Sequence, residues 1–341
     1  MIQNQAQLLG YLDSIKDVDC LGIDTEFRRI DTYYPKLCLV QISTPESAEC
    51  IDVLSISDLD PLFNTLYDNN MTWVVHSARQ DIEAFYLLSG QLPNKLFDTQ
   101  IAAALFNLPL QVSYQALTEH FEGVFLEKAH ARFDWTKRPL PKDVIEYALN
   151  DVRYLLPIFE KLQTQLKNTN KIEWLNEETN ALLNPELYDA PIDKVFQKIK
   201  GVSRLNSQYR PLAFQLCAWR EDTAKRKNKP RKWIMSDEKL LDYACNKLTL
   251  SPSSQKIFDN FIKINDVTLN PNTPINNHKP LNKSEKNTKN QLQQRINNIA
   301  TEYNLPPELI ITSKSLSSYI RGDLNAPLCR GWRAKLFNKE T

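Results

Sequence analysis

Apolar and polar positions follow two different periods in the first half of the chain. Short runs rich in Val, Ile, Leu and Cys predict four strands, at 19–27, 37–43, 48–54 and 72–77. Apolar residues at helical spacing predict helices over 79–88, 98–107 and 141–166. Three strands with short connectors, followed by alternating helices, indicate a mixed α/β domain at 1–168 whose first three strands are antiparallel neighbours. This pattern does not give the strand order.

The rest of the chain is predicted to be mainly helical. Residues 169–204 are polar with helical spacing and indicate a connector. A compact helical block with an apolar and aromatic face follows at 205–264. Residues 265–290 are rich in Asn and poor in large apolar residues, which indicates a linker. A second helical block is expected at 291–341.

Charge is divided unevenly, although the net charge is only +1. Residues 1–160 hold 12 Lys and Arg against 23 Asp and Glu, a balance of −11. Residues 161–341 hold 30 against 18, a balance of +12. An acidic part suits the binding of cations, and a basic part suits the binding of a polyanion. The alternative is that solvated surface charges are distributed unevenly along the chain without a functional reason.

Glycine is scarce, and its spacing excludes several classes of enzyme. The chain has seven glycines, and the nearest two, Gly322 and Gly331, are nine residues apart. The motifs GxGxxG and GxSxG and the P-loop need closer glycines, so none of them occurs. Dinucleotide enzymes of the usual Rossmann type, nucleophile-elbow hydrolases and P-loop ATPases are therefore excluded.

The cysteines and the first residues bear on the cellular compartment. The six cysteines form no CxxC pair and have no zinc-ligand spacing, which is typical of reduced thiols in the cytosol. The start, MIQNQAQLLG, lacks the basic and apolar segments of a signal peptide. No uncharged apolar run approaches the roughly 18–20 residues that span a bilayer. We therefore expect a cytoplasmic protein.

Two carboxylates stand at the end of the first predicted strand, where apolar residues would be expected. Asp24 and Glu26 are two positions apart, so they point to the same side of the strand. Together they repel each other and lose hydration unless something compensates. Asp81 opens the helix after the fourth strand, and Tyr147 and Asp151 share one face of the long helix.

Each of these motifs alone is common by chance, and surface polarity would explain it. Their conjunction next to apolar elements is more specific. Four carboxylates with one phenol meet the requirements of a two-metal phosphodiesterase site. Mg²⁺ and Mn²⁺ prefer oxygen ligands, and two ions about 4 Å apart can clamp the attacking and leaving oxygens. The sequence therefore predicts a site for divalent cations.

The same residues carry a family resemblance. GIDTEF, HSARQDIEAF and YALNDVRYLLPIF resemble the three exonuclease motifs of the DEDD superfamily, in the subclass with a tyrosine in the third motif. TYYPKLCLVQI and RFDWTKRPLP resemble the ribonuclease D family in particular. Residues 205–244, with the core FQLCAWRE, resemble an HRDC module, and the last block, with CRGWRAKLF, resembles a more divergent second copy. The resemblance implies a ribonuclease H-like α/β exonuclease domain followed by two small all-α HRDC domains.

The resemblance also implies roles for the site residues. Asp24, Glu26, Asp81 and Asp151 would hold two divalent metal ions, Mg²⁺ or Mn²⁺, and Tyr147 would orient the attacking water. The reaction would be hydrolysis of the 3′-terminal phosphodiester, which releases nucleoside 5′-monophosphates one at a time. The implied substrates are transfer RNA precursors and other small structured RNAs, and we expect a monomer because no heptad repeat indicates assembly.

Further residues are candidates for contacts with RNA. Phe27 beside the acids could stack on a base or could belong to the core. A loop at 132–141 could contact RNA bases and phosphates through Trp135, Lys137 and Arg138. The alternative is that the Trp is packed in the core and the two cations are solvated. A basic strip at 220–232 could bind phosphates or could be a solvated helix end: Lys225, Arg226, Lys227, Arg231 and Lys232. For His76, a structural hydrogen bond at a strand end is preferred to a catalytic role.

Two other functions compete with an exoribonuclease. A DNA-directed 3′→5′ exonuclease would use the same metals and acids, and only contacts to the 2′-hydroxyl would distinguish it. A non-catalytic RNA-binding protein with a decayed nuclease fold would be expected to have lost at least one metal ligand. All four acids and the tyrosine are present, which favours an active enzyme.

Overall fold

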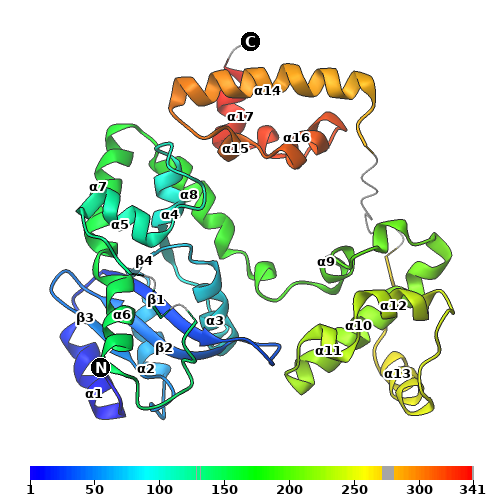
Figure 1. The fold of residues 1–341 in the computed structure, drawn as a ribbon, viewed down its shortest axis with the longest axis horizontal. Coiled ribbons are helices and arrows are strands. Elements are labelled where there is room, and N and C mark those ends of the chain that lie inside the picture. Colours follow the sequence, from blue (N-terminus) through cyan, green and yellow to red (C-terminus); the bar gives the residue numbers. More distant parts are fainter. Residues whose placement is uncertain (128, 131, 271–279, 340–341) are drawn as a thin grey trace. The chain divides into compact units, whose positions relative to one another are not determined.

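Five strands form one mixed sheet in the order β3-β2-β1-β4-β5. Their bounds are β1 Cys20–Arg28, β2 Lys36–Ser43, β3 Ala48–Ile51, β4 Thr72–Val75 and β5 Lys95–Asp98. β2 and β3 are antiparallel, whereas β4 is parallel to both β1 and β5. The mixed α/β architecture agrees with the prediction, but the short strand β5 was not predicted. Figure 1 shows the sheet with helices around it.

The computed structural model describes residues 1–127, 129, 130, 132–270 and 280–339. The chain divides into two units, one of which combines Met1–Arg28, Leu37–Asn184 and Leu281–Thr341. The other combines Arg29–Lys36 with Pro185–Pro280. Among the described residues, no helix has both the length and the apolar content that crossing a membrane requires.

Eight helices belong to the sheet domain: α1 Gln5–Ser14, α2 Asp60–Leu66, α3 Arg79–Ser89, α4 Thr99–Ala104, α5 Tyr114–Glu122, α6 Lys142–Arg153, α7 Leu155–Asn168 and α8 Ile172–Asn180. α4, α5, α7 and α8 share one apolar cluster with β4 and β5, to which Val74, Leu155 and Ile158 belong. The amphipathic spacing of α6 and α7 gives each of them one buried face.

The predicted helix over 141–166 is in fact two helices. Pro157 lacks the N–H that a continuous helix would donate to the carbonyl of Arg153, and its ring would clash with that carbonyl. α6 therefore ends at Arg153, and α7 starts at Leu155. The backbone N–H of Tyr154, at the junction, donates a 3.0 Å hydrogen bond to the hydroxyl of Tyr114.

Gly22 allows the first strand to lie unusually close to its neighbours. A Cβ atom at this position would lie 2.2 Å from Ser43 Oγ and 3.1 Å from Leu155 Cβ. Any larger residue would push β1 away from β2 and from α7. The glycine thus helps to set the position of Asp24, two residues further along the same strand.

The C-terminal helices pack on the sheet domain within the same unit. They are α14 Lys283–Tyr303, α15 Pro307–Ile310, α16 Ser313–Ile320 and α17 Gly331–Asn338. Trp332 of α17 stacks on Trp174 of α8 with 4.7 Å between ring centroids. Glu178 accepts hydrogen bonds from Trp332 Nε1 at 2.9 Å and from Arg333 Nη2 at 2.8 Å. This last block therefore shares a core with the sheet domain.

Part of the predicted linker at 265–290 is helical, because α14 begins at Lys283. Asn282 Oδ1 accepts from Glu285 N at 2.9 Å, and Glu285 Oε2 accepts from Asn282 N at 2.7 Å. This capping box satisfies two backbone donors at the start of the helix. Residues 271–279 of the predicted linker lie outside the described residues.

The second unit is helical, with α9 Ile192–Gln197, α10 Arg210–Lys227, α11 Arg231–Ile234, α12 Asp237–Ala244 and α13 Pro252–Ile264. The long helix α10 is at its centre and buries Phe214, Cys217 and Trp219 against the other helices. Arg220 of α10 is 3% exposed in its side chain and forms a 2.7 Å ion pair with Asp237. Segment Arg29–Lys36 belongs to this unit through contacts of Tyr33 and Tyr34 with the end of α10.

Candidate active site

The strand β1 continues beyond the end of its parallel neighbour β4. Cys20, Leu21 and Gly22 are in register with Thr72, Trp73 and Val74 of β4. β4 ends at Val75, whereas β1 runs on to Arg28. Asp24 and Glu26 therefore lie on a part of β1 that extends past the end of β4.

A sharp turn after β4 directs α3 back toward β1. Ser77 adopts a positive φ of 62°, and the N–H groups of Ser77 and Ala78 donate to the Asp98 carboxylate at 3.1 and 2.9 Å. Asp98 ends β5 and also caps α4. The turn brings Asp81, in the first turn of α3, next to β1, where its Oδ1 accepts a 2.5 Å hydrogen bond from Thr25 Oγ1. Sequence reasoning missed Asp98, and the Asp-Thr pair before an apolar helix is a capping signal that could have indicated it.

The helix α6 contributes Tyr147 and Asp151. Its C-terminal end is tied to β2 by a 2.8 Å hydrogen bond from Ser43 Oγ to the carbonyl of Val152. The buried positions Val144, Ala148 and Val152 face the sheet domain. Tyr147 and Asp151 are four residues apart on this helix, so they lie on the same face of it.

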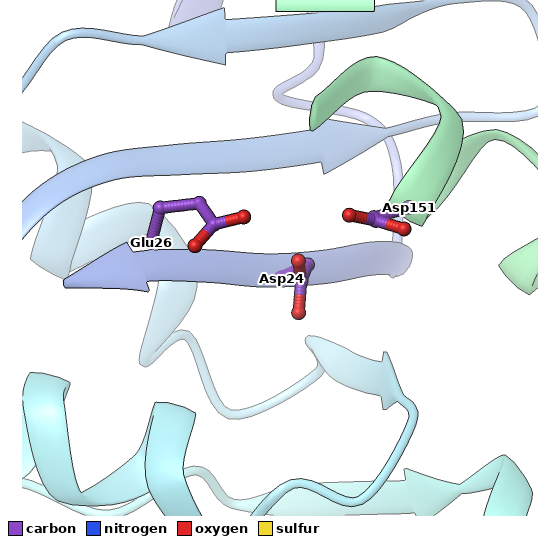
Figure 2. A group of neighbouring side chains, drawn as sticks. All are labelled: Asp24, Glu26 and Asp151. Atoms are coloured by element: carbon purple, nitrogen blue, oxygen red, sulfur yellow. The ribbon is translucent and has the colours of Figure 1, made fainter. Parts of the chain in front are cut away.

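Three carboxylates meet between β1 and α6. The oxygens of Asp24, Glu26 and Asp151 lie within 4.8 Å of one another. Figure 2 shows Asp24 and Glu26 on one strand with Asp151 facing them from the helix. Asp81 is outside this group, but its charge is close enough to raise the pKa of both Asp24 and Glu26. The structure thus brings together all four predicted acids, three of them in one tight cluster.

A cavity of about 270 Å³ opens at the carboxylates. Its walls are formed by Asp24, Thr25, Glu26, His76, Tyr114, Gln115, Tyr147, Asp151 and Leu155. Tyr114 and Gln115, at the start of α5, were not among the predicted site residues. The site is thus open to a ligand directly above the acids.

The electrostatics of the site call for positive charge. Loss of hydration, followed by the neighbouring charges of Asp151 and Asp81, raises the pKa of Glu26 to about 9. Burial raises the pKa of Asp151 to about 7, and burial also raises that of Asp81 to about 7 against the hydrogen bond from Thr25. The pKa of Asp24 is raised by burial and by the charges of Asp81, Asp151 and Glu26. In the described part of the chain, the main causes that raise these pKa values are burial and, for Asp24 and Glu26, the neighbouring carboxylates.

This donor set fits divalent metal ions. Carboxylate oxygens are the ligands that Mg²⁺ and Mn²⁺ prefer. Bound cations would compensate the repulsion and desolvation that raise the pKa values of the acids. The residues that could hold such ions are Asp24, Glu26 and Asp151, with Asp81 beside them.

The raised pKa values predict how the stability of the metal-free protein depends on pH. The pKa of Glu26 is about 9 in the folded protein, whereas that of a glutamate in the unfolded chain is about 4. The folded protein therefore binds this proton more tightly, which stabilises it at low pH. That stability is lost as the pH rises through the folded pKa. In EDTA, raising the pH from 6 to 9 should therefore lower the Tm of the wild type by about 5 °C more than it lowers the Tm of Glu26→Gln. Scanning calorimetry would measure this, and saturating Mg²⁺ should reduce the difference; a difference independent of pH would contradict the prediction.

His76 has a structural role, as the sequence favoured. Nε2 donates to the carbonyl of Val112 at 2.9 Å, and Nδ1 lies at hydrogen-bond distance, 2.9 Å, from Thr99 Oγ1, whose hydroxyl donates to the carbonyl of Val75 at 3.0 Å. Burial lowers the pKa of the imidazole, although the charge of Asp98 opposes this. Both ring nitrogens are therefore engaged in holding β4, α4 and the segment before α5 together.

Two residues of the 132–141 loop contact other parts of the protein. Trp135 is only 3% exposed and packs in a cluster with Leu140 and Val144. Arg138 binds Asp52 through Nε and Nη2, both at 2.6 Å, and Asp52 is fully buried. These positions favour the alternative of a packed Trp, and they show the Arg138 guanidinium engaged with Asp52; RNA contact by either residue stays a prediction. Lys137 is exposed.

The basic strip is partly neutralised by its own unit. Lys225 pairs with Asp189 at 2.7 Å, Arg226 with Asp222 at 2.8 Å, and Arg231 with Glu221 at 2.5 Å. Lys227 and Lys232 are exposed and have no ion pair among the described residues. Phe27 is half-buried and does not line the cavity.

The fold and the site together define a 3′→5′ exonuclease domain of the DEDD type. A family model for 3′–5′ exonucleases matches residues 1–167, and this family is metal-dependent. A ribonuclease D from Bartonella henselae is 32% identical, over 96% of this chain and 86% of its own length. Another, from Sphingobium indicum, is 35% identical over 84% of this chain and 74% of its own.

A solved structure agrees with these sequence relatives. The crystal structure of Escherichia coli RNase D, an exoribonuclease involved in structured RNA processing, matches with a TM-score of 0.85 and 25% identity. The match covers 98% of this chain and 95% of that one. The chain therefore belongs to the ribonuclease D family, and it is a hydrolase, a 3′→5′ exoribonuclease.

Proposed function

We propose that this enzyme trims the 3′ ends of transfer RNA precursors and other small structured RNAs and releases nucleoside 5′-monophosphates. The observation that carries the proposal is the cluster of Asp24, Glu26 and Asp151 at the cavity, which Tyr147 also lines. We further propose that the enzyme acts as a monomer in the cytoplasm. All six cysteines are free thiols, which supports that compartment.

The four acids have a common role in this proposal. Asp24, Glu26, Asp81 and Asp151 hold two divalent ions, Mg²⁺ or Mn²⁺. When bound, such ions stabilise the negative charge that develops on the attacking and leaving oxygens. The chain itself supplies the preorganisation, because β1, α3 and α6 hold the acids before any substrate arrives.

Tyr147 orients the attacking water in this proposal. Burial and the charges of Asp151, Glu26 and Asp24 raise the pKa of its phenol, so the hydroxyl stays protonated near neutral pH. A protonated phenol acts through hydrogen bonds rather than as a base. Tyr147 lines the same cavity as Asp24, Glu26 and Asp151.

Tyr147→Phe tests this role. We expect kcat on RNA to fall about 100-fold, with unchanged KM and unchanged metal affinity, because only the orienting hydroxyl is lost. Steady-state kinetics and calorimetric metal titration measure these quantities. Tyr67→Phe is the control, since its hydroxyl binds Ser89 at 2.9 Å far from the acids. Full activity in Tyr147→Phe would refute the role.

The helical parts are proposed to bind RNA. We assign HRDC-type domains to 205–264 and 291–341, with 169–204 as connector and 265–290 as linker, from the sequence resemblance. Phe27, Lys137 and the strip residues remain proposed contacts, of which Lys227 and Lys232 are the best supported because both are exposed and unpaired among the described residues.

A time course on 5′-labelled transfer RNA with a few extra 3′ nucleotides tests the function. Mg²⁺, Mn²⁺ and EDTA arms establish the need for metal, and a DNA strand of the same sequence runs in parallel. We expect a metal-dependent ladder that shortens from the 3′ end on RNA only. Digestion of DNA alone would replace the proposal with a DNA exonuclease, and binding without cleavage would leave only an RNA-binding function.

A further inference from the structure

One tryptophan differs from the others in its exposure. Trp233 in the short helix α11 is 63% exposed. Of the remaining five tryptophans, Trp174 is half-buried and four are buried. A large aromatic side chain loses favourable burial when it stays in water. Its exposure is therefore a feature that requires an explanation.

Cations surround this indole. Lys229 Nζ lies 5.5 Å from the centroid of the Trp233 ring. Lys227 and Lys232 are exposed, and in the described part of the chain none of these three lysines forms an ion pair. The other strip cations, at positions 225, 226 and 231, are paired with acids. Among the described residues, the strip lysines without an ion pair are therefore Lys227, Lys229 and Lys232, and Lys229 lies over the Trp233 ring.

The turn that carries Trp233 is firmly held. Arg231, at the start of α11, binds Glu221, and its guanidinium lies 4.8 Å from the ring of Tyr33. Asn228 Oδ1 accepts hydrogen bonds from the N–H groups of Tyr33 and Tyr34 at 3.0 and 3.1 Å. Because both ends of the turn are anchored, its backbone is already ordered, and binding at the exposed ring would cost little conformational entropy.

We propose that Trp233, together with Lys227, Lys229 and Lys232, forms a stacking site for an unpaired base of the RNA substrate. This site is outside the catalytic cavity, and the inference rests on the proposed function in taking RNA as the ligand. Indole faces stack on any base, and lysines gain affinity by releasing counterions from phosphates. An exposed ring could also suit a protein partner, but three lysines without an ion pair in the described part of the chain favour a polyanion.

Variants of the full-length enzyme test the site on an RNA hairpin with a single-stranded 3′ tail. Trp233→Ala should raise KM about 10-fold with little change in kcat, whereas Trp233→Phe should keep most of the affinity because it can still stack. Hydrolysis of a dinucleotide should be unchanged, since it has no further unpaired base that could stack on Trp233. Leu324→Ala, at a residue that is 83% exposed, is the control and should behave like wild type.

A second measurement reports stacking directly and without catalysis. In EDTA, oligouridylate should quench the fluorescence of wild type, and Trp233→Phe should lose that part of the quenching. Lys227→Ala with Lys232→Ala should flatten the salt dependence of binding by a slope of about 1.4, whereas Lys256→Ala with Lys263→Ala, which removes two exposed lysines of α13, should not.

The outcomes separate this inference from the proposed function. Unchanged KM and quenching in Trp233→Ala would overturn the stacking site and would leave the surface to a protein partner. Equal losses on the dinucleotide would also overturn it, because the residue would then act through the fold. If wild type failed to shorten any RNA while the quenching remained specific to Trp233, the proposed function would fall and the stacking site would stand.

Discussion

Asp24→Asn should abolish hydrolysis, with a loss of at least about 1,000-fold in rate, and should spare RNA binding. Asp24 lies in the cluster whose oxygens are within 4.8 Å of one another, so its charge is central to holding cations. Losing the charge stabilisation that the cations supply costs several kcal/mol in the transition state, which corresponds to this factor. Single-turnover cleavage of 5′-labelled RNA and a filter-binding titration measure the two properties separately.

The same variant should make the metal-free protein more stable. The pKa of Asp24 is raised by burial and by the neighbouring acids, so its charge opposes folding at neutral pH. Asp19→Asn is the matched control, because it removes one exposed carboxylate just before the same strand. It should leave both the rate and the Tm unchanged. Substantial hydrolysis in Asp24→Asn would show that the cluster is not the metal site.

Arg138→Ala should destabilise the sheet domain by about 3–5 kcal/mol and lower Tm by about 10 °C. Its guanidinium pairs with both oxygens of Asp52, a side chain with no exposure to solvent. It also donates to the carbonyls of Cys38 and Trp135 at 2.9 and 2.8 Å. Removing it would leave a buried carboxylate without its counter-ion. Urea unfolding would measure the loss.

Lys137→Ala is the control for this experiment, because the adjacent lysine is exposed and carries the same charge. It should change stability by less than about 0.5 kcal/mol. The double variant Asp52→Asn with Arg138→Met should recover part of the loss, since no uncompensated charge remains buried. If Arg138→Ala unfolded like wild type but bound RNA more weakly, the residue would be an RNA contact after all.

The site shows why the acids could be predicted and some of their supports could not. Asp24 and Glu26 were recognisable because a period of two places them on one side of a strand. The capping role of Asp98 at α4 could have been read locally, but its bonds to Ser77 and Ala78 could not, because these partners are about 20 residues away in sequence. The same holds for Tyr114, which meets the backbone of Tyr154 only after folding.

The basic residues show the same limit. A run of lysines and arginines looks uniform in the sequence, yet Arg231 and Lys225 are paired with acids of their unit, and Lys232 is not. Partner choice depends on distances between side chains that composition does not contain. The exposure of Trp233 is likewise visible only in the structure, since most tryptophans are expected to be largely buried.

The sequence by itself determined the α/β class of the first domain, the helical character of the rest, the four acids with Tyr147, and the family. Local periodicity and motif spacing carry this information because they act between near neighbours in the chain. Only the tertiary structure decided the strand order, the break at Tyr154, the burial of Trp135, the pairing of Arg138 with the buried Asp52, and the packing of Trp332 on Trp174. These depend on contacts between residues far apart in sequence, whose energies exist only once the chain has folded.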